Sequence, residues 1–303
     1  MRKTIGKRRT TASDGYRKGL SLKSVARALV YNALGAVLWC ANHVIRPSQH
    51  IILLYHKQRA TSFERQLRHL RRFYRIISLE ELVFGREALE GSRPLAAITF
   101  DDGLANNYEI LKSLKRRGIP ATLFLTTGYV GKGVPLWPVV SGETGLDDLK
   151  GAFSYESCLA HLERGGAAAD PDDVIMTEDQ LRDIDGGSIS IAPHTRSHPF
   201  LTELAGPDLL EEVQGSIDDI RRYRSHVDAV FAPPFGDYDA STLSVILSRT
   251  EVRAVVSIEP GVVSRGEVPK VFRRIGIPDS CGLGEFVFRA NGLQAKVNKL
   301  LGR

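Results

Sequence analysis

The stretch LAAITFDDG, residues 95–103, decides how this chain is organised. Its short apolar run ends in two acids and a glycine, which predicts a buried strand that opens onto a loop. Adjacent carboxylates at the end of a buried strand are unfavourable unless a cation or hydrogen-bond donors balance them. A metal ion on one acid and a mobile proton on the other would suit hydrolysis, whereas a solvated Asp-Asp-Gly turn is the ordinary alternative.

Strands and helices alternate on both sides of this stretch. The apolar patterns predict strands at 51–56, 76–78, 121–125, 188–192, 229–232, 254–258 and 271–277, and helices at 62–74, 79–84, 108–114, 209–223 and 243–248. Such a βα array with right-handed crossovers forms a barrel or a doubly wound sheet. In both folds the loops that follow the strands lie at one face, so we expect the functional site there.

The remaining chain divides into four parts by composition. Residues 1–24 are polar and basic, which predicts a disordered tail, and residues 25–45 predict an apolar or amphipathic helix. The body covers residues 50–282, with an insertion at about 131–187 of the kind that usually lies near a functional face. Residues 283–303 predict one or two closing helices.

The charge of the chain is concentrated at its N-terminus. Residues 1–27 hold nine Lys and Arg against one Asp, which is 9 − 1 or +8, so the remainder of a chain of net charge +6 carries −2. A body without basic excess argues against nucleic-acid binding, while the N-terminal segment can attract anionic surfaces. The three cysteines lie far apart and predict neither a disulfide framework nor a cysteine-based zinc site.

The apolar N-terminal segment has three interpretations. Its cleanest run, Ala28 to Ala41, is shorter than the ~20 residues that span a bilayer, and no Ala-x-Ala-like cleavage site follows it. A helix docked on the body is favoured, a helix on a membrane surface comes next, and export remains as the last alternative. We therefore expect a cytoplasmic protein that residues 1–45 can bring to the inner face of the membrane.

The stretch HTRSH, residues 194–198, follows the predicted strand at 188–192. Histidines four positions apart share one face of a helical turn, so His194 and His198 can reach one ion. Two histidines and one carboxylate are a common ligand set for a catalytic divalent cation, although an isolated histidine pair is more often structural. A proline on each side stiffens this loop.

The stretch FAPPFG, residues 231–236, also follows a predicted strand. Its two prolines restrict the backbone, Phe235 offers an apolar wall, and a rigid loop can direct a backbone N–H at an oxyanion. By itself such a stretch is more often a stiff turn. Its position on the same predicted face as the other two stretches favours a functional role for it.

Together and in this order, the three stretches resemble those of the NodB-homology polysaccharide deacetylases of carbohydrate esterase family 4, in particular the poly-N-acetylglucosamine deacetylase-like branch. The resemblance extends from about Ile51 to about Ile277 and includes the Leu-Tyr-His end of the first strand. It implies an α/β fold, a distorted (β/α) barrel with about seven parallel strands. It also implies metal-dependent removal of N-acetyl groups from amino sugars, which is the hydrolysis of a linear carbon–nitrogen amide bond.

The resemblance also assigns roles to individual residues. Asp102, His194 and His198 would bind one divalent metal ion, most simply Zn²⁺, with Co²⁺, Ni²⁺ and Mn²⁺ suited to the same ligands. Asp101 would be the general base that takes a proton from the metal-activated water. The backbone N–H of Phe235 would help to hold the oxyanion.

Two departures from the family pattern leave roles open. Ala232 stands where many members carry an arginine that orients the base, and Arg273 or Arg274 on a late strand is the candidate replacement. No histidine follows His226, so the late Leu-x-His motif that supplies the general acid is missing. His56, at the end of the first predicted strand, is the candidate acid, although a structural strand-end histidine is an equal alternative.

Three functions remain in competition after the sequence has been read. The first is deacetylation of an N-acetylated polysaccharide or its precursor, as in exopolysaccharide synthesis. The second is deacylation of a lipid-linked or small amino sugar at the membrane face, which the basic N-terminal segment favours. The third is a non-catalytic carbohydrate-binding protein on a decayed deacetylase scaffold, which the missing histidine supports and the intact carboxylate pair contradicts.

Overall fold

A computed structural model describes the protein over residues 22–44, 47, 49–85, 93–136, 150, 153–164, 171–222, 224, 226–263 and 270–293. Most of the basic tail expected at 1–24, much of the insertion and the last ten residues lie outside the described residues.

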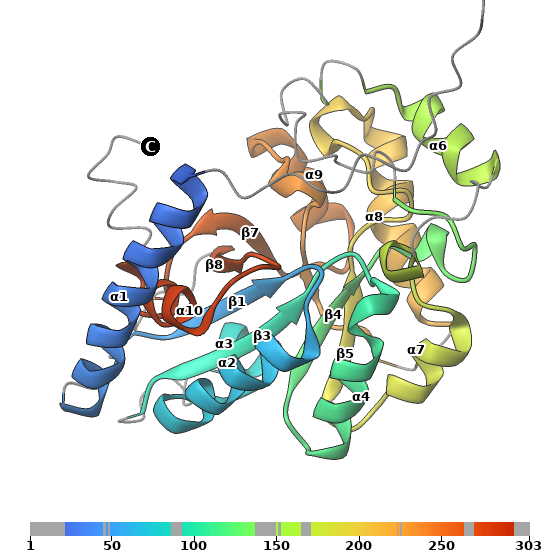
Figure 1. The fold of residues 1–303 in the computed structure, drawn as a ribbon. Coiled ribbons are helices and arrows are strands. Elements are labelled where there is room, and N and C mark those ends of the chain that lie inside the picture. The colour runs from blue at the N-terminus through green and yellow to red at the C-terminus, as the bar shows by residue number, and fades with distance from the viewer. Residues whose placement is uncertain are drawn as a thin grey trace, which may run out of the picture.

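Parallel strands form a nearly closed barrel surrounded by helices, as the resemblance implied (Figure 1). Along the described chain the strands are β1 (Ile51–Tyr55), β2 (Arg75–Ile76), β3 (Leu95–Phe100), β4 (Ala121–Leu125), β5 (Ile189–Pro193), β6 (Val230–Phe231), β7 (Ala254–Pro260) and β8 (Val271–Ile277). Seven of them follow the order β5-β4-β3-β1-β8-β7-β6, and the short β2 pairs with β3 outside this path. At the gap between β5 and β6, the Ala232 N–H donates to the Pro193 carbonyl at 3.5 Å. The doubly wound alternative is therefore wrong.

Helices cover the outside of the barrel. They are α1 (Leu22–Val44), α2 (Ala60–Phe73), α3 (Leu79–Phe84), α4 (Tyr108–Arg116), α6 (Tyr155–Arg164), α7 (Glu178–Ile184), α8 (Gly206–Ile220), α9 (Ala240–Arg249) and α10 (Leu283–Ala290). Ser78 begins α3 by accepting a hydrogen bond from the Glu81 N–H, because a serine at this position satisfies a donor of the first turn. The helix predicted at 209–223 begins and ends three residues earlier, since Pro207 suits a first turn.

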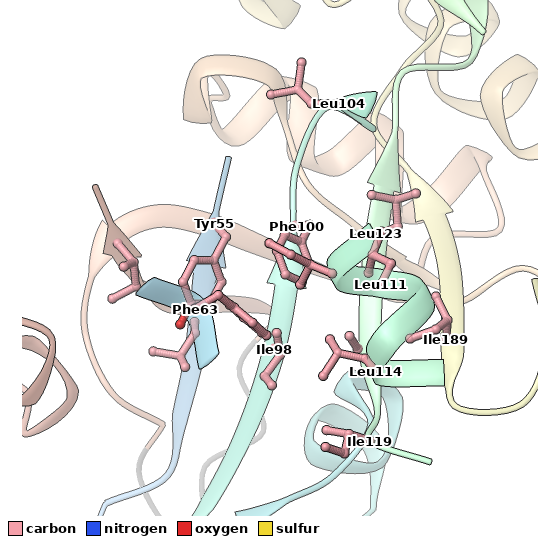
Figure 2. Packing of buried hydrophobic residues seen from close by; sticks show 14 of the residues in the cluster. Tyr55, Phe63, Ile98, Phe100, Leu104, Leu111, Leu114, Ile119, Leu123 and Ile189 are labelled. Carbon is pink, nitrogen blue, oxygen red and sulfur yellow. The ribbon is translucent and has the colours of Figure 1, made fainter. Parts of the chain in front are cut away.

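The core lies where the central strands meet α2 and α4 (Figure 2). Every residue of β1 and β3 is buried, which is typical of parallel strands that are covered on both faces. The Tyr55 ring stacks on Phe100 with centroids 5.3 Å apart, and Phe63 of α2 meets Tyr55 edge-on at 5.4 Å. Phe100 directly precedes the two acids, so this aromatic packing holds the end of β3 in place.

The described part of the insertion folds back over the loop that follows β3. Leu104 and Ile175 form an antiparallel bridge, and the Met176 N–H donates to the Gly103 carbonyl at 3.0 Å. The insertion therefore lies at the strand-end face, and it also contributes lining to the pocket described next.

Candidate active site

A pocket of about 520 Å³ opens at the carboxyl ends of the strands. Six of the residues proposed from the sequence line it: His56, Asp101, Asp102, His194, His198 and Phe235. They come from the loops after β1, β3, β5 and β6, which are distant in the sequence and meet because parallel strands end at one face. The seventh, Arg274, is fully buried and reaches Asp101 from β8.

Asp102, His194 and His198 converge on one point of this pocket. The Asp102 Oδ1 lies 3.3 Å from the His194 Nε2 and 3.4 Å from the His198 Nε2. Three ligand atoms, one from each residue, lie within 4.8 Å of one another. In a tetrahedral site with bonds of about 2.0–2.1 Å, neighbouring ligand atoms are about 3.3–3.4 Å apart, so these separations fit a zinc-sized ion.

The hydrogen bond of the His194 ring turns its other ring nitrogen toward Asp102. Its Nδ1 lies 2.6 Å from the Ala232 carbonyl oxygen, a contact that requires the proton on Nδ1. The buried Nε2 then presents a lone pair and has no hydrogen-bond partner among the described residues. A lone pair that faces a carboxylate oxygen at 3.3 Å is repulsive unless a proton or a metal ion lies between them. The three side chains therefore fit a divalent ion.

The charges of this cluster shift its pKa values in different directions. Burial alone would raise the pKa of Asp102, but contacts with His194 and His198 hold it well below its usual value. Burial alone would lower the pKa of His194, but the Asp102 contact and the charges of both acids raise it. Burial dominates at His198, whose pKa is lowered. Asp102 is thus held as an anion, which is the form that binds a metal ion.

Asp101 is not part of this cluster, because its carboxylate is paired with Arg274. Both of its carboxylate oxygens accept hydrogen bonds from Arg274, Nη1 to Oδ1 and Nη2 to Oδ2, each at 2.7 Å. The guanidinium also donates to the Ser257 carbonyl at 3.0 Å and to the Thr99 hydroxyl at 3.2 Å. Arg273, the other candidate, faces outward and pairs with Glu259 at 3.2 Å. Arg274 therefore occupies the position relative to Asp101 that Ala232 cannot fill.

Backbone strain in the described residues is concentrated at this site. The non-glycine residues with positive φ are Asp102 (72°), Thr195 (68°), His198 (62°) and Phe235 (57°). The backbone of a non-glycine residue rarely adopts this left-handed conformation, and residues that are held in it are concentrated at functional sites. Three of the four are residues that the sequence assigned to metal binding or to the oxyanion.

The histidine loop has a different conformation from the one expected. Residues 194–198 form no helical turn, so the reason first given for placing both histidines on one face is wrong. The left-handed backbone at Thr195 and His198 brings the two imidazoles together instead, with ring centroids 5.1 Å apart. The Thr195 hydroxyl accepts from the His198 N–H at 3.1 Å, which stabilises this conformation.

A buried acid that the motif analysis missed supports the same loop. Glu212 of α8 is 1 % exposed and accepts hydrogen bonds from the backbone N–H groups of Arg196 and Ser197 at 2.8 and 2.9 Å. It also accepts from the Ser197 hydroxyl at 2.6 Å and from the Tyr155 hydroxyl at 2.8 Å. A signal was present in the sequence, because Glu212 interrupts the apolar face of α8 three residues after Leu209.

The remaining two candidates lie at the rim. The Phe235 ring meets His198 edge-on, with centroids 4.6 Å apart, and stacks on Phe200 at 4.3 Å, which makes the expected apolar wall. His56 is exposed in the pocket, and its charge helps to lower the pKa of Asp102. A second potential metal group joins Glu80 of α3 to His226 and Asp228, which lie just before β6 and so at the opposite end of the barrel.

The fold and the site together define a class of protein, a (β/α) barrel with a carboxylate pair and a site of two histidines and one aspartate at the strand ends. The model of the polysaccharide deacetylase family matches residues 89–255, more than half of the chain. The chain therefore belongs to the polysaccharide deacetylase family, which is a family of hydrolases. No curated protein matches it by sequence.

Several solved structures share the fold. The Streptococcus pyogenes deacetylase PplD, solved with acetate, is 19 % identical over 80 % of this chain and 97 % of its own, with a TM-score of 0.58. IcaB from Ammonifex degensii is 18 % identical over 81 % and 98 %, with a TM-score of 0.59. The BpsB deacetylase domain from Bordetella bronchiseptica is 16 % identical over 75 % and 95 %, with a TM-score of 0.55. At these identities the likeness is one of fold.

Proposed function

We propose that this protein is a metal-dependent hydrolase that removes N-acetyl groups from amino sugars of a polysaccharide or of its precursor. One observation carries the proposal. The two adjacent acids have separate partners, because Asp101 is paired with Arg274 while Asp102 faces two histidines. Adjacent acids with unlike surroundings suit different roles, here proton transfer and metal binding.

Asp102, His194 and His198 would hold the ion, and zinc suits this set while Co²⁺, Ni²⁺ and Mn²⁺ accept the same ligands. When bound, the ion would polarise the acetyl carbonyl and lower the pKa of water toward ~7. Asp101 would take the proton of the attacking water, with its carboxylate held in orientation by the two hydrogen bonds from Arg274.

The remaining roles belong to groups at the rim. The backbone N–H of Phe235 would donate to the oxyanion that forms when water adds to the acetyl carbon, since its loop is rigid and lines the pocket. The amine of the sugar leaves only after it gains a proton. His56 lines the same pocket and is our candidate for that acid, because the chain contains no histidine after His226.

The test is acetate release from N-acetylglucosamine oligomers, using metal-stripped protein refilled with Zn²⁺ or Co²⁺. We expect release to depend on the ion and to be lost in Asp101→Asn, while His198→Ala loses stoichiometric metal. Asp179→Asn is the matched control, since this aspartate of α7 is 97 % exposed and lies outside the pocket and outside both potential metal groups. Protein that binds no metal at the Asp102 site would refute the proposal.

A second candidate function is deacylation of a lipid-linked amino sugar at a membrane surface. The exposed apolar side of α1, described below, favours it. Bound metal without acetate release from oligomers, together with release from a lipid-linked N-acetyl sugar, would select this alternative. Sugar binding without release from any N-acylated sugar would select the non-catalytic carbohydrate-binding function.

A further inference from the structure

Exposed apolar side chains are concentrated on one helix of this protein. Within the described residues, the large apolar side chains that are exposed outside α1 are Ile258 and Leu283, each 39 % exposed. Five others lie on α1: Leu29 (66 %), Val30 (57 %), Leu34 (45 %), Val37 (67 %) and Trp39 (43 %). A monomeric soluble protein rarely exposes such a contiguous set, so this face of α1 indicates a binding surface.

The opposite side of α1 is docked on the barrel through α10 (Figure 1). The two helices approach so closely at Gly35 that a Cβ built there would lie 1.9 Å from the carbonyl oxygen of Gly284. Tyr31 packs on Phe288 with ring centroids 4.9 Å apart. The helix is therefore held by its inner side, and its apolar outer side is presented away from the body.

The outer side of α1 continues into an apolar groove beside α10. This groove of about 290 Å³ is lined by Gly35, Ala36, Trp39, Cys40, Leu283, Gly284 and Val287. From Ala28 to Val44 the sequence contains no Lys, Arg, Asp or Glu. The surface therefore offers contact area without a charged group that would select a polar protein partner.

The length of the apolar run and the charge before it identify the occupant. None of the helices within the described residues is long and apolar enough to cross a bilayer. The segment directly before the run, residues 1–27, carries a net charge of +8, whereas the rest of the chain carries −2. An apolar helix face beside concentrated positive charge suits the interface of a bilayer with anionic headgroups. A second copy on this face would bring another such segment near the first, which opposes self-association.

We propose that the outer face of α1 lies in the surface of a bilayer that contains anionic lipid, with the basic residues of 1–27 on the headgroups. The apolar side chains enter the boundary between headgroups and acyl chains, and the contact with α10 attaches the barrel to that surface. The pocket then works at a membrane, where a growing or lipid-attached glycan is concentrated. The surface itself is independent of the proposed deacetylation.

The test is co-sedimentation of the full-length, metal-loaded protein with phosphatidylcholine vesicles that contain about 30 % phosphatidylglycerol or none, near 0.15 M salt. We expect strong partition onto the anionic vesicles and at least ~10-fold weaker partition onto the neutral ones. Val30→Glu with Val37→Glu should abolish the partition. The matched control, Ser241→Glu with Ser244→Glu, places the same charges on exposed positions of α9 and should bind like wild type.

A second variant leaves α1 unchanged and so tests the proposal even if Val30→Glu with Val37→Glu disturbs the fold. Lys7, Arg8 and Arg9 changed together to serine leave the described body unchanged in sequence and should weaken binding to anionic vesicles by about 100-fold, from about fivefold per cation near the surface. Equal binding by wild type and both variants, or no binding to vesicles at all, would refute the proposal. A wild-type dimer that Val30→Glu with Val37→Glu converts to monomer, without vesicle binding, would instead assign the face to a second copy.

Discussion

Replacement of Arg274 by methionine leaves the carboxylate of Asp101 buried without its partner. Arg274 is 0 % and Asp101 2 % exposed, and two hydrogen bonds of 2.7 Å join them. Removal of one member of such a buried pair costs about 3–5 kcal/mol, because the remaining charge keeps its desolvation penalty. At about 2–4 °C per kcal/mol for a domain of this size, we expect the melting temperature to fall by about 6–20 °C.

The neighbouring arginine on the same strand is the matched control. Arg273 is exposed and its pair with Glu259 is 3.2 Å long, so Arg273→Met should cost less than about 1 kcal/mol. In acetate release, Arg274→Met should lower kcat at least ~10-fold with a smaller change in KM, since a mispositioned base loses part of its contribution of ~10²–10⁴-fold. Arg273→Met should leave both parameters unchanged.

A double-mutant cycle decides whether the two groups act as a pair. Arg274→Met combined with Asp101→Leu removes both charges, so the free energy of unfolding should recover above that of either single variant. Activity should stay absent, because the proposed base is gone. If the losses of stability of the two single variants simply add in the double variant, the buried pair is not coupled and the reasoning is refuted.

Three further predictions concern the support of the histidine loop, the three cysteines and a buried aspartate. Glu212→Ala leaves two backbone N–H groups of the histidine loop without their acceptor, so zinc affinity measured against a chelator should fall ~10–100-fold, and an unchanged affinity would contradict this support. Burial raises the pKa of Cys158 to about 11 and that of Cys281 to about 12, so a thiol reagent near neutral pH should label exposed Cys40 alone in the native protein and all three cysteines after denaturation. Burial also raises the pKa of Asp228 in the folded state. Between the unfolded-state pKa of about 3.9 and the folded-state pKa, the folded protein therefore binds more protons than the unfolded chain, and its stability falls as the pH rises through this range. Asp228→Asn should therefore melt higher than wild type near pH 7 and like wild type near pH 3, whereas a pH-independent difference would contradict the shift.

The fold was largely predictable, because local patterns of apolar and polar residues predict its strands and helices. The short apolar runs predicted every strand within the described residues, and the bounds expected for 121–125 and 271–277 agree with β4 and β8. The residues alone did not distinguish a barrel from a doubly wound sheet, since the order of strands in a sheet is not a local property. The family resemblance chose the barrel, and the structure confirms it.

The candidate residues could be selected from the sequence, whereas their geometry could be predicted only in part. Six candidates line one pocket because each lies in a loop that follows a strand, and that rule needs only the sequence. The left-handed backbone of the histidine loop was not predictable, since it depends on hydrogen bonds to Glu212, which belongs to a helix later in the chain.

By itself the sequence selected the candidate groups for the proposed chemistry: two acids, two histidines and a proline-restricted loop, each in a loop that follows a strand. Only the tertiary structure decided which acid has which partner. Arg274 lies 173 residues from Asp101 along the chain and reaches it because β1 alone separates β8 from β3 in the barrel. A contact across the strand order depends on how the whole sheet closes, and no local pattern of residues contains that information.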